Sequence, residues 1–533
     1  MEDRKKGRQR GSGVIMYRIS GIRTAIRDDR KTIRKKIEKR IGKYGKGLKI
    51  QEITIVKESL DARDKKNITW VYTVDFRTEP KANLPLPEGG EQPYRLPPSG
   101  TLPCTERPVV CGFGPAGMFC ALILAEAGYR PIVLERGKRT DERVRDVERF
   151  WQEGILDAES NVQFGEGGAG TFSDGKLVSG IRDPRVRKVL HEFVEAGAKE
   201  EILYRQKPHV GTDQLRRIVV NLREKILRYG GTVLFSTRLE EVEITNGAVS
   251  AAIVSSGSTR QRIETNAVVL AVGHSARDTM RKLYSQGLQM EQKPFSIGVR
   301  IEHSQKAIDT AQYGAPHEVL ALPPAEYKLS HRNEDGRGVY TFCMCPGGTV
   351  IAAASQNGMS VTNGMSYSAR DGANANSALL VDVRPSDFET DHPLAGISFQ
   401  ERYERLAFEN GSGVLHLPNS SWGEFKSASG DGMRVRNSIP KFASEAMLEA
   451  MPHLARKLKG FDDADARVTA VESRSSSPVR IPRNEAFESN WKGLYPAGEG
   501  AGYAGGIVSA ASDGIRVAEA FIRKYQKIIQ SEG

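Results

Sequence analysis

A glycine-rich stretch near residue 110 has the spacing that binds phosphate groups. The run Pro108-Val-Val-Cys-Gly-Phe-Gly-Pro-Ala-Gly117 places the pattern G-x-G-x-x-G directly after a short apolar strand. The first glycine permits a tight turn, the second lets the backbone approach a pyrophosphate, and the third allows close helix–strand packing. The helix that follows offers free N–H groups and the positive end of its dipole. The pattern predicts a bound dinucleotide rather than a turn without a ligand. We expect the site to include Gly112, Gly114, Pro115, Ala116 and Gly117.

An acidic residue follows at a distance that suits a ribose ligand. The helix pattern ends at Gly128, and Pro131-Ile-Val-Leu-Glu135 reads as a second strand that ends in an acid. In dinucleotide-binding units a carboxylate roughly 20 residues after the glycines accepts hydrogen bonds from ribose hydroxyls. Glu135 is the candidate, and we include the neighbouring Arg136 in the expected site.

A second glycine-rich element lies near the C-terminus. Gly493-Leu-Tyr-Pro-Ala-Gly-Glu-Gly-Ala-Gly-Tyr-Ala-Gly-Gly-Ile507 reads as a strand, an acidic turn and the start of a helix. Glu499 would accept hydrogen bonds from sugar-like hydroxyls, and the last glycines would place backbone N–H groups against a flat ring. The helix N-terminus would favour negative charge there. The expected site residues are Gly498, Glu499, Gly505, Gly506 and Ile507.

Together, these two elements resemble the FAD-containing oxidoreductases built on the two-dinucleotide-fold plan. In that superfamily the first motif holds the ADP half of FAD, and the late motif holds the ribityl chain and the flavin. Glu499 stands where an Asp is commoner. The strand 268–272, which ends at Gly273, resembles the strand whose turn lies near the pyrophosphate. The strand that begins at Thr232 resembles the one beside the adenine.

Another glycine-rich segment, Asn161-Val-Gln-Phe-Gly-Glu-Gly-Gly-Ala-Gly-Thr-Phe-Ser-Asp-Gly-Lys176, lies between these elements. It matches most of a P-loop, but Leu177 stands where a Ser or Thr should hold Mg²⁺, so we reject nucleotide hydrolysis. A backbone nest that touches FAD phosphate or flavin is favoured over a flexible loop. The expected contacts are Gly167, Gly168, Thr171, Ser173 and Lys176.

The same segment supports a narrower resemblance, over nearly the whole chain. With Phe295-Ser-Ile-Gly-Val-Arg-Ile-Glu-His303, Tyr340-Thr-Phe-Cys-Met-Cys-Pro-Gly-Gly348 and Thr362-Asn-Gly-Met-Ser366 it resembles the FAD-dependent, or NAD(FAD)-utilizing, dehydrogenases. The resemblance implies FAD but names no substrate. Outside the glycine-rich segments already assigned to FAD, the sequence contains no further G-x-G-x-x-G, which argues against a dedicated nicotinamide domain. NAD(P)H stays open as a transient electron donor.

The expected fold is α/β: a glutathione-reductase-like FAD-binding Rossmann domain, an inserted mixed α/β substrate domain and a small N-terminal α+β domain. Eight of the 25 prolines lie between residues 80 and 108, which predicts an extended linker. The expected boundaries are therefore 1–79 for the N-terminal domain and 80–107 for the linker. The FAD-binding domain would span 108–290 and 466–533, around an insertion at 291–465.

In the N-terminal region we expect a strand at residues 14–19 and a helix that Asp28 and Asp29 cap. Ile33, Ile37 and Ile41 recur with helical spacing, and residues 68–76 alternate as in a strand. The predicted order is strand, helix, strand, strand.

Charge is concentrated in the same region. The formal net charge is +12, and residues 1–50 alone hold 18 Lys or Arg and 5 Asp or Glu. Nucleic acid or an acidic surface is one interpretation. A solvated face of an amphipathic helix is favoured, because the aromatic-rich pattern of RNA-binding motifs is missing. That face would carry Arg34, Lys35, Lys36 and Lys39.

Composition excludes several classes of protein. Hydrophobic residues make up 39 %, enough for folded cores, but no run is long enough for a membrane span. The charged N-terminus does not resemble a secretory signal, and five cysteines do not form a disulfide framework. We therefore expect a reducing, cytoplasmic setting and a small-molecule substrate. The oligomeric state is left open.

The catalytic residues are not evident from the sequence. The pair Cys343 and Cys345 could supply a thiolate near flavin, although two structural core thiols are the favoured interpretation. His274 could be an acid or base, or only a local hydrogen-bonding group. No Cys and His set has zinc spacing. We expect an FAD-dependent oxidoreductase that transfers hydride at flavin N5. The alternatives are an RNA-associated flavoprotein and a non-catalytic redox sensor.

Overall fold

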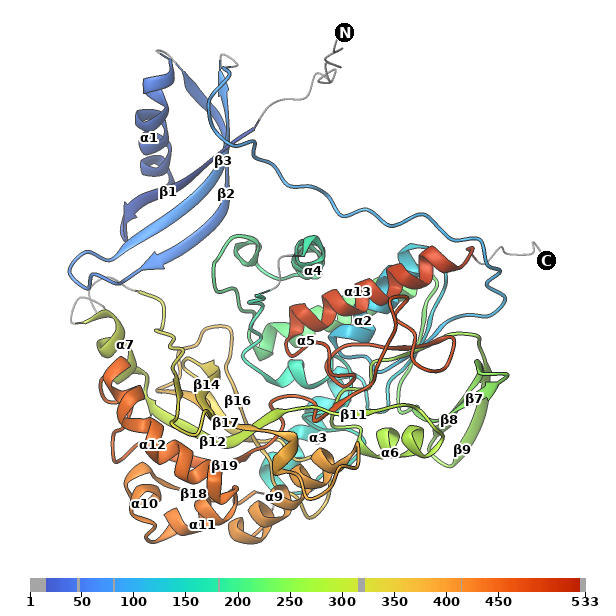
Figure 1. Ribbon diagram of the computed structural model, residues 1–533. Helices are drawn as coiled ribbons and strands as arrows, with labels where there is room; N and C mark the ends of the chain where they lie inside the picture. Colours follow the sequence, from blue (N-terminus) through green and yellow to red (C-terminus); the bar gives the residue numbers. More distant parts are fainter. Residues whose placement is uncertain are drawn as a thin grey trace, which may run out of the picture. The chain divides into compact units, whose positions relative to one another are not determined.

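The computed structural model describes residues 16–45, 48–79, 82–180, 183–314, 322–413 and 415–527. The chain divides into two compact units (Figure 1). The first lies within Met1–Pro93, Leu203–Pro208 and Tyr313–Leu322, and the second holds the remainder. Within the described residues no helix combines the length and the apolar character that crossing a membrane requires.

The first unit has the predicted order of strand, helix, strand and strand. Its elements are β1 (Tyr17–Ala25), α1 (Arg30–Ile41), the 3₁₀ turn η1 (Gly42–Tyr44), β2 (Lys49–Asp61) and β3 (Thr69–Glu79). The three strands form an antiparallel sheet in the order β1-β3-β2. β1 begins and ends later than expected, and Val14 and Ile15 lie outside the described residues.

Helix α1 is amphipathic, as predicted. Asp29 caps it by accepting a hydrogen bond from the Thr32 backbone N–H. Ile33, Ile37 and Ile41 are buried in one apolar cluster with side chains of the sheet. The four predicted basic residues are half-buried or exposed, which fits a solvated helix face.

The proline-rich segment at 80–107 does not behave as a free linker. Its first part belongs to the first unit, where Pro87 O accepts from Arg18 N and Gly89 N donates to Met16 O. From Tyr94 onward it belongs to the second unit, where Gly100 N donates to Ile522 O and Tyr525 O. An extended backbone leaves its N–H and C=O groups without partners inside the segment. Here these groups form hydrogen bonds with the first unit at one end of the segment and with the second unit at the other.

The second unit contains a five-stranded parallel sheet in the order β21-β10-β4-β5-β6. These strands are short apolar runs, which is typical of a parallel sheet covered on both faces. Helices α2 and α13 pack side by side (Figure 1). The strands and the helices of this part are β4 (Val109–Cys111), α2 (Pro115–Glu126), β5 (Ile132–Leu134), α3 (Thr140–Glu153), α4 (Pro184–Glu195), α5 (Thr212–Arg228), β6 (Thr232–Leu234), β10 (Val268–Leu270), α6 (Arg277–Ser285), β21 (Leu494–Pro496) and α13 (Ile507–Lys524).

Smaller elements surround this sheet. Strands β7 (Arg238–Thr245), β8 (Ala248–Ser256) and β9 (Thr259–Glu264) form an antiparallel sheet. Two 3₁₀ turns, η2 (Ala169–Phe172) and η3 (Glu200–Leu203), lie between helices. Strands β11 (Glu291–Gln292) and β20 (Val479–Arg480) pair at the two ends of the inserted region.

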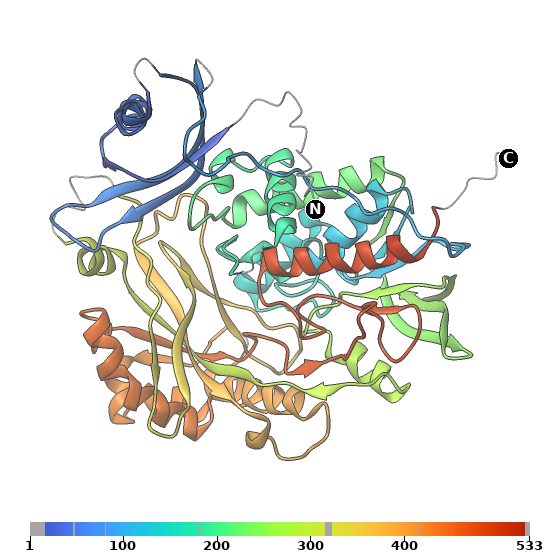
Figure 2. The ribbon, with the colours of Figure 1, turned by 45° about the horizontal axis from the view of Figure 1, so that its top comes forward.

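The inserted region is built on a six-stranded antiparallel sheet in the order β13-β14-β17-β12-β19-β18. Figures 1 and 2 show its later helices, those of residues 395–457, coloured orange and gathered along one side of the sheet. The elements are β12 (Phe295–Ser304), α7 (Gln305–Tyr313), β13 (Ser330–Arg332), β14 (Gly338–Cys345), β15 (Thr349–Ala352), β16 (Thr362–Met365), β17 (Asn374–Val383), η4 (Pro385–Asp387), α9 (Ala395–Gly411), β18 (Asn419–Ser421), α10 (Trp422–Ser427), α11 (Asp431–Asn437), α12 (Lys441–Lys457) and β19 (Arg467–Glu472).

The expected end of the insertion at residue 465 needs correction. Strand β19 follows that point, and it pairs with β12 in the centre of the antiparallel sheet. Five of its six residues are buried. The chain therefore returns toward the parallel sheet only after Glu472.

Candidate functional site

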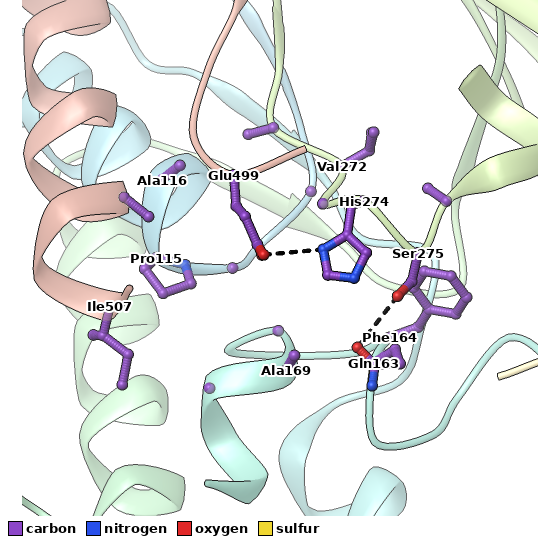
Figure 3. Close-up of a pocket in the computed structure, with 18 of the residues that line it drawn as sticks. Pro115, Ala116, Gln163, Phe164, Ala169, Val272, His274, Ser275, Glu499 and Ile507 are labelled. Atoms are coloured by element: carbon purple, nitrogen blue, oxygen red, sulfur yellow. Dashed lines mark hydrogen bonds and ion pairs between the residues drawn. The ribbon is translucent and has the colours of Figure 1, made fainter. Parts of the chain in front are cut away.

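A cavity of about 410 Å³ lies in the second unit. One group of lining residues, here called the parallel-sheet wall, follows the strands of the parallel sheet and begins helices α2 and α13 (Figure 3). A second group, the inserted wall, comes from the antiparallel sheet and the segment after it. The parallel-sheet wall comprises residues 112–116, Glu135, Arg136, residues 271–276, Glu499 and residues 505–507. The inserted wall comprises Phe342, Cys343, Asn363, Glu472, Arg474 and Ser475.

The three glycines of the first pattern have different surroundings. Gly112 has φ +100°, and a Cβ there would lie 2.3 Å from the Ala271 carbonyl oxygen. A Cβ at Gly117 would lie 1.9 Å from the Gly112 carbonyl oxygen. A Cβ at Gly114 would meet only the Gly168 Cα, at 3.8 Å. Two glycines are thus required by protein packing, whereas the third leaves space free at the start of α2.

Glu135 holds three loops of the parallel-sheet wall together. Its Oε2 accepts from Phe113 N at 2.8 Å, and its Oε1 accepts from Gly137 N at 2.8 Å and Gly165 N at 2.9 Å. The side chain is buried but still lines the cavity. The expected ribose ligand therefore also fixes the shape of the turn around it.

Arg136 also lines the cavity, but other side chains engage its charge. The guanidinium makes paired hydrogen bonds to Glu159 and Asp278 and lies over the Phe164 ring. These carboxylates outweigh burial and raise the pKa of Arg136.

The glycine-rich segment forms a nest against the first turn. Gly165, Gly167 and Gly168 have φ of +120°, +86° and +65°, which favours glycine at each position. Gly167 N donates to Phe113 O, and a Cβ at Gly168 would lie 2.9 Å from the Gly114 Cα. Gly168 and Ser173 line the cavity. The expected contacts Gly167, Thr171, Gly117 and Gly498 are not among its lining residues and lie behind it.

Buried charges support the nest, and the sequence analysis missed them. Arg143 is fully buried and donates to the carbonyl oxygens of Asn161, Val162, Glu166 and Gly168. Burial lowers the pKa of Arg143 to about 10, so it is charged at neutral pH. Glu166 is paired in turn with Arg223 at 3.1 Å. The sequence pattern of helices α3 and α5 did not reveal these buried charges, because a charged residue on an amphipathic helix is normally expected at the surface.

Lys176 contacts both the glycine-rich segment and the inserted sheet. Its Nζ donates to Met344 O of β14 and lies 3.8 Å from Asp174 and 3.6 Å from Glu326. Asp174 is itself held by paired hydrogen bonds from Arg370. The structure therefore connects Lys176, which lines the cavity, to the inserted sheet.

His274 and Glu499 form a pair across two turns of the parallel-sheet wall (Figure 3). His274 Nδ1 lies 3.0 Å from Glu499 Oε1, and His274 is 7 % exposed. Its Nε2 has no hydrogen-bond partner within the described residues. The Glu499 turn is fixed by Asp513, which accepts from Gly498 N and pairs with Arg483 at 2.7 Å. The sequence identified both members but not their contact.

The two candidate thiols have different positions. Cys343 is solvent-accessible and lines the cavity, whereas Cys345 is buried and does not. Desolvation by the surrounding protein raises the pKa of both thiols, that of Cys345 to about 12. Both are protonated at neutral pH, which favours the structural interpretation over a thiolate. The described residues contain no group of three or more His, Cys, Asp or Glu that could hold a metal.

Comparisons with known proteins cover both units. Residues 294–475 match the family "FAD-dependent protein, C-terminal domain-like", and this match spans the inserted wall. Residues 16–77 match a domain of unknown function, DUF8436. An uncharacterized protein of Clostridium beijerinckii is 45 % identical over 536 residues, which covers 96 % of this chain and 99 % of that protein.

Among solved structures, the flavin-dependent brominase Bmp2 matches 78 % of this chain and 79 % of its own, with 12 % identity and a TM-score of 0.36. Glycerol-3-phosphate dehydrogenase from Bacillus halodurans, complexed with FAD, matches 78 % and 64 %, with 12 % identity and a TM-score of 0.35. A geranylgeranyl bacteriochlorophyll reductase-like protein from Thermoplasma acidophilum matches 78 % and 77 %, with the same identity and TM-score. These TM-scores are low, so we base no inference on the three structures.

Proposed function

This chain belongs to the family of the Clostridium beijerinckii protein, and we propose that it is an FAD-dependent oxidoreductase acting on an unidentified small organic substrate. One observation carries the proposal. Helices α2 and α13 both begin at a single cavity, and the inserted wall of that cavity lies within the region that matches an FAD-dependent family. In the proposed architecture the parallel sheet is the FAD-binding domain of glutathione-reductase-like type.

The residues of the parallel-sheet wall fit a dinucleotide. A Cβ at Gly114 would enter open space beside the first turn of α2, where backbone N–H groups favour phosphate. A Cβ at Gly505 would meet no other atom within 4 Å, so the start of α13 is open in the same way. His274 Nε2 is a buried polar atom without a partner within the described residues. A polar cofactor could supply hydrogen-bond partners for the backbone N–H groups at the two helix starts and for His274 Nε2.

In this proposal FAD supplies hydride transfer at its N5 atom. Glu135 keeps the phosphate-binding turn in shape and directs its remaining lone pairs to ribose hydroxyls. Glu499, held near His274, accepts hydrogen bonds from the sugar-like chain. The first turn of α13 stabilises negative charge. Phe342 and Cys343 of the inserted wall line the side where substrate binds.

The visible absorption spectrum of the purified protein tests the proposal. We expect an oxidised-flavin spectrum in the parent protein and its loss in Gly114→Val, because the valine side chain would fill the space beside α2. Gly42→Ala is the control, since a Cβ there meets nothing within 4 Å. Anaerobic NADH or NADPH then shows whether a nicotinamide bleaches the flavin. Normal flavin content in Gly114→Val, or a parent protein that does not take up FAD, would contradict the assignment.

A further inference from the structure

Strand β14 contains an irregularity where it reaches the cavity. Phe342 pairs with Ala378 and Cys345 with Asn376, so two residues, Cys343 and Met344, stand opposite one. Cys343 has φ +44°, a left-handed conformation that is uncommon for this residue type. Such β-bulges re-aim side chains, often beside active sites.

The bulge turns two consecutive side chains into the cavity. Neighbouring residues of a regular strand point to opposite faces, yet Phe342 and Cys343 both line the cavity and are both exposed. Phe342 is 36 % exposed, and Val178, a third lining residue, is 53 % exposed. Phe342 and Val178 therefore each contribute exposed apolar surface to the cavity.

Two cations hold the bulge in place. A bulge leaves carbonyl groups outside the ladder, and these need other partners. Cys343 O accepts from Arg300 Nη1 at 2.9 Å, and Met344 O accepts from Lys176 Nζ. Arg300 is fully buried and makes paired hydrogen bonds to Glu472. The backbone of the inserted wall thus depends on side chains from β12 and from the glycine-rich segment.

The charged groups of this wall are balanced by neighbours. Glu472 is paired with Arg300, at 2.7 Å. Lys176 and Arg370 face Asp174 and Glu326. Arg474 and Arg277 share Glu404, and Glu401 lies 4.0 Å from Arg277. Asn363 carries no charge, and its Oδ1 accepts from Arg300.

Burying an ion against such a wall would be unfavourable. An ionised group that loses its water needs a partner of opposite charge, and the two lining charges of the inserted wall, Glu472 and Arg474, already have one, as does Lys176 beside them. The apolar side chains instead favour contact with uncharged surface. We propose that the substrate bound against the inserted wall is an uncharged molecule with an apolar face, and that Lys176 is a positioning residue for the Phe342–Cys343 bulge. This inference rests on the proposed function.

Cys343 allows a direct test, because it is the one described cysteine that is exposed. Three methanethiosulfonate reagents form mixed disulfides with thiols: the neutral methyl, the anionic sulfonatoethyl and the cationic trimethylammonioethyl compound. Their rates at the Cys343 peptide of the protein as purified are measured by mass spectrometry and divided by their rates with 2-mercaptoethanol. The thiolate fraction cancels from the comparison of the three ratios. Cys343→Ser is the control for assignment of the peptide.

We expect the neutral reagent to exceed both charged reagents by more than about tenfold, because a charged reagent loses hydration at this wall without gaining a partner of opposite charge. An anionic or cationic reagent that matches the neutral one would overturn the substrate class. Failure of all three to modify Cys343 would also overturn it, because the wall would then be closed to substrate. Flavin content is measured on the same sample. A protein that neither contains nor takes up FAD refutes the proposed function, while the order of the reagents still decides the character of the wall.

Variants of Lys176 test its positioning role. Lys176→Met removes the donor to the Met344 carbonyl oxygen, so the bulge should shift, and we expect the rate ratio of the neutral methyl reagent at Cys343, which a change of charge alone would not alter, to change by roughly tenfold. Lys176→Arg keeps the charge and should restore the parent ratio. An unchanged ratio in Lys176→Met would refute the role of Lys176.

Discussion

The parallel-sheet wall reaches the cavity through glycine-rich turns and the starts of two helices, whereas the inserted wall reaches it through the side chains of an antiparallel sheet and the segment after it. In the first, Gly112 and Gly117 allow close packing, and Gly114 leaves space at the start of α2. In the second, paired ions such as Arg300–Glu472 lie behind Phe342 and Cys343. Backbone N–H groups can bind the same ligand in many proteins, while side chains are specific to one chain. Under the proposed function, the first wall would bind the cofactor and the second would select the substrate.

The largest expected effect is a loss of stability on replacing Glu404, which is paired with Arg474 of the inserted wall. Glu404 is fully buried between Arg277, at 2.7 Å, and Arg474, at 2.8 Å. Glu404→Ala would leave two buried guanidinium groups without their shared partner, and we expect it to lower the free energy of unfolding by about 3–5 kcal/mol. Urea denaturation measures the loss. The control is Glu389→Ala, which breaks an exposed pair with Arg402 and should cost about 1 kcal/mol at most. Equal losses of unfolding free energy in the two variants would show that the buried ion pairs stabilise the fold no more than the exposed pair does.

The next effect separates stability from cofactor binding within the parallel-sheet wall. Gly117→Ala drives a methyl group into the Gly112 carbonyl and should cost about 1–3 kcal/mol. Gly114→Ala should leave the melting temperature near that of the parent and weaken FAD binding. Thermal unfolding and flavin content are measured on both variants. If Gly114→Ala melts as early as Gly117→Ala, the two glycines do not differ as described.

The next effect is a dependence of the free energy of unfolding on pH, which we expect to arise from Glu404. The two guanidinium groups outweigh burial and hold the pKa of Glu404 well below its ordinary value of 4.5. Stability from this group is complete above pH 4.5 and is lost as the pH falls toward the folded-state pKa. The free energy of unfolding should therefore fall less steeply below pH 4.5 in Glu404→Gln than in the parent. Parallel acid limbs would refute this assignment.

The smallest effect concerns Cys343. Because desolvation raises the pKa of this thiol above 9.0, its alkylation by iodoacetamide should still accelerate as the pH passes 9.0. Cys343→Ser should retain flavin and change the free energy of unfolding by about 0.5 kcal/mol or less. A plateau in the alkylation rate below pH 9.0 would indicate a thiolate and would reopen a redox role.

The sequence predicted the parallel-sheet wall far better than the inserted wall. Glycine spacing reports local backbone demands, so the turn at residue 112 and the starts of α2 and α13 could be found without a structure. The contact between His274 and Glu499 joins residues more than 200 positions apart, and no local pattern indicates it. The Cys343 bulge depends on register against β17. Its supports, Arg300 and Lys176, come from separate parts of the chain.

The boundary of the inserted domain also depends on contacts between distant residues, which the sequence pattern does not reveal. Strand β19, Arg467-Val-Thr-Ala-Val-Glu472, is a short sequence that could belong to either sheet, and only its pairing with β12 shows which one it joins. The proline count in the segment 80–107 correctly indicated extended backbone. It could not indicate which neighbours would pair with that backbone.

The hydrogen bonds of Glu135 have a kinetic consequence. One carboxylate fastens three loops, and Arg143 also holds the third of them through the carbonyl oxygens of residues 161–168, so the glycine-rich turn keeps its shape through contacts within the protein. Little chain entropy is then lost when a cofactor arrives. Uptake should proceed at the rate of diffusive encounter without a slow refolding phase, and differences in affinity among variants should reside in the dissociation rate.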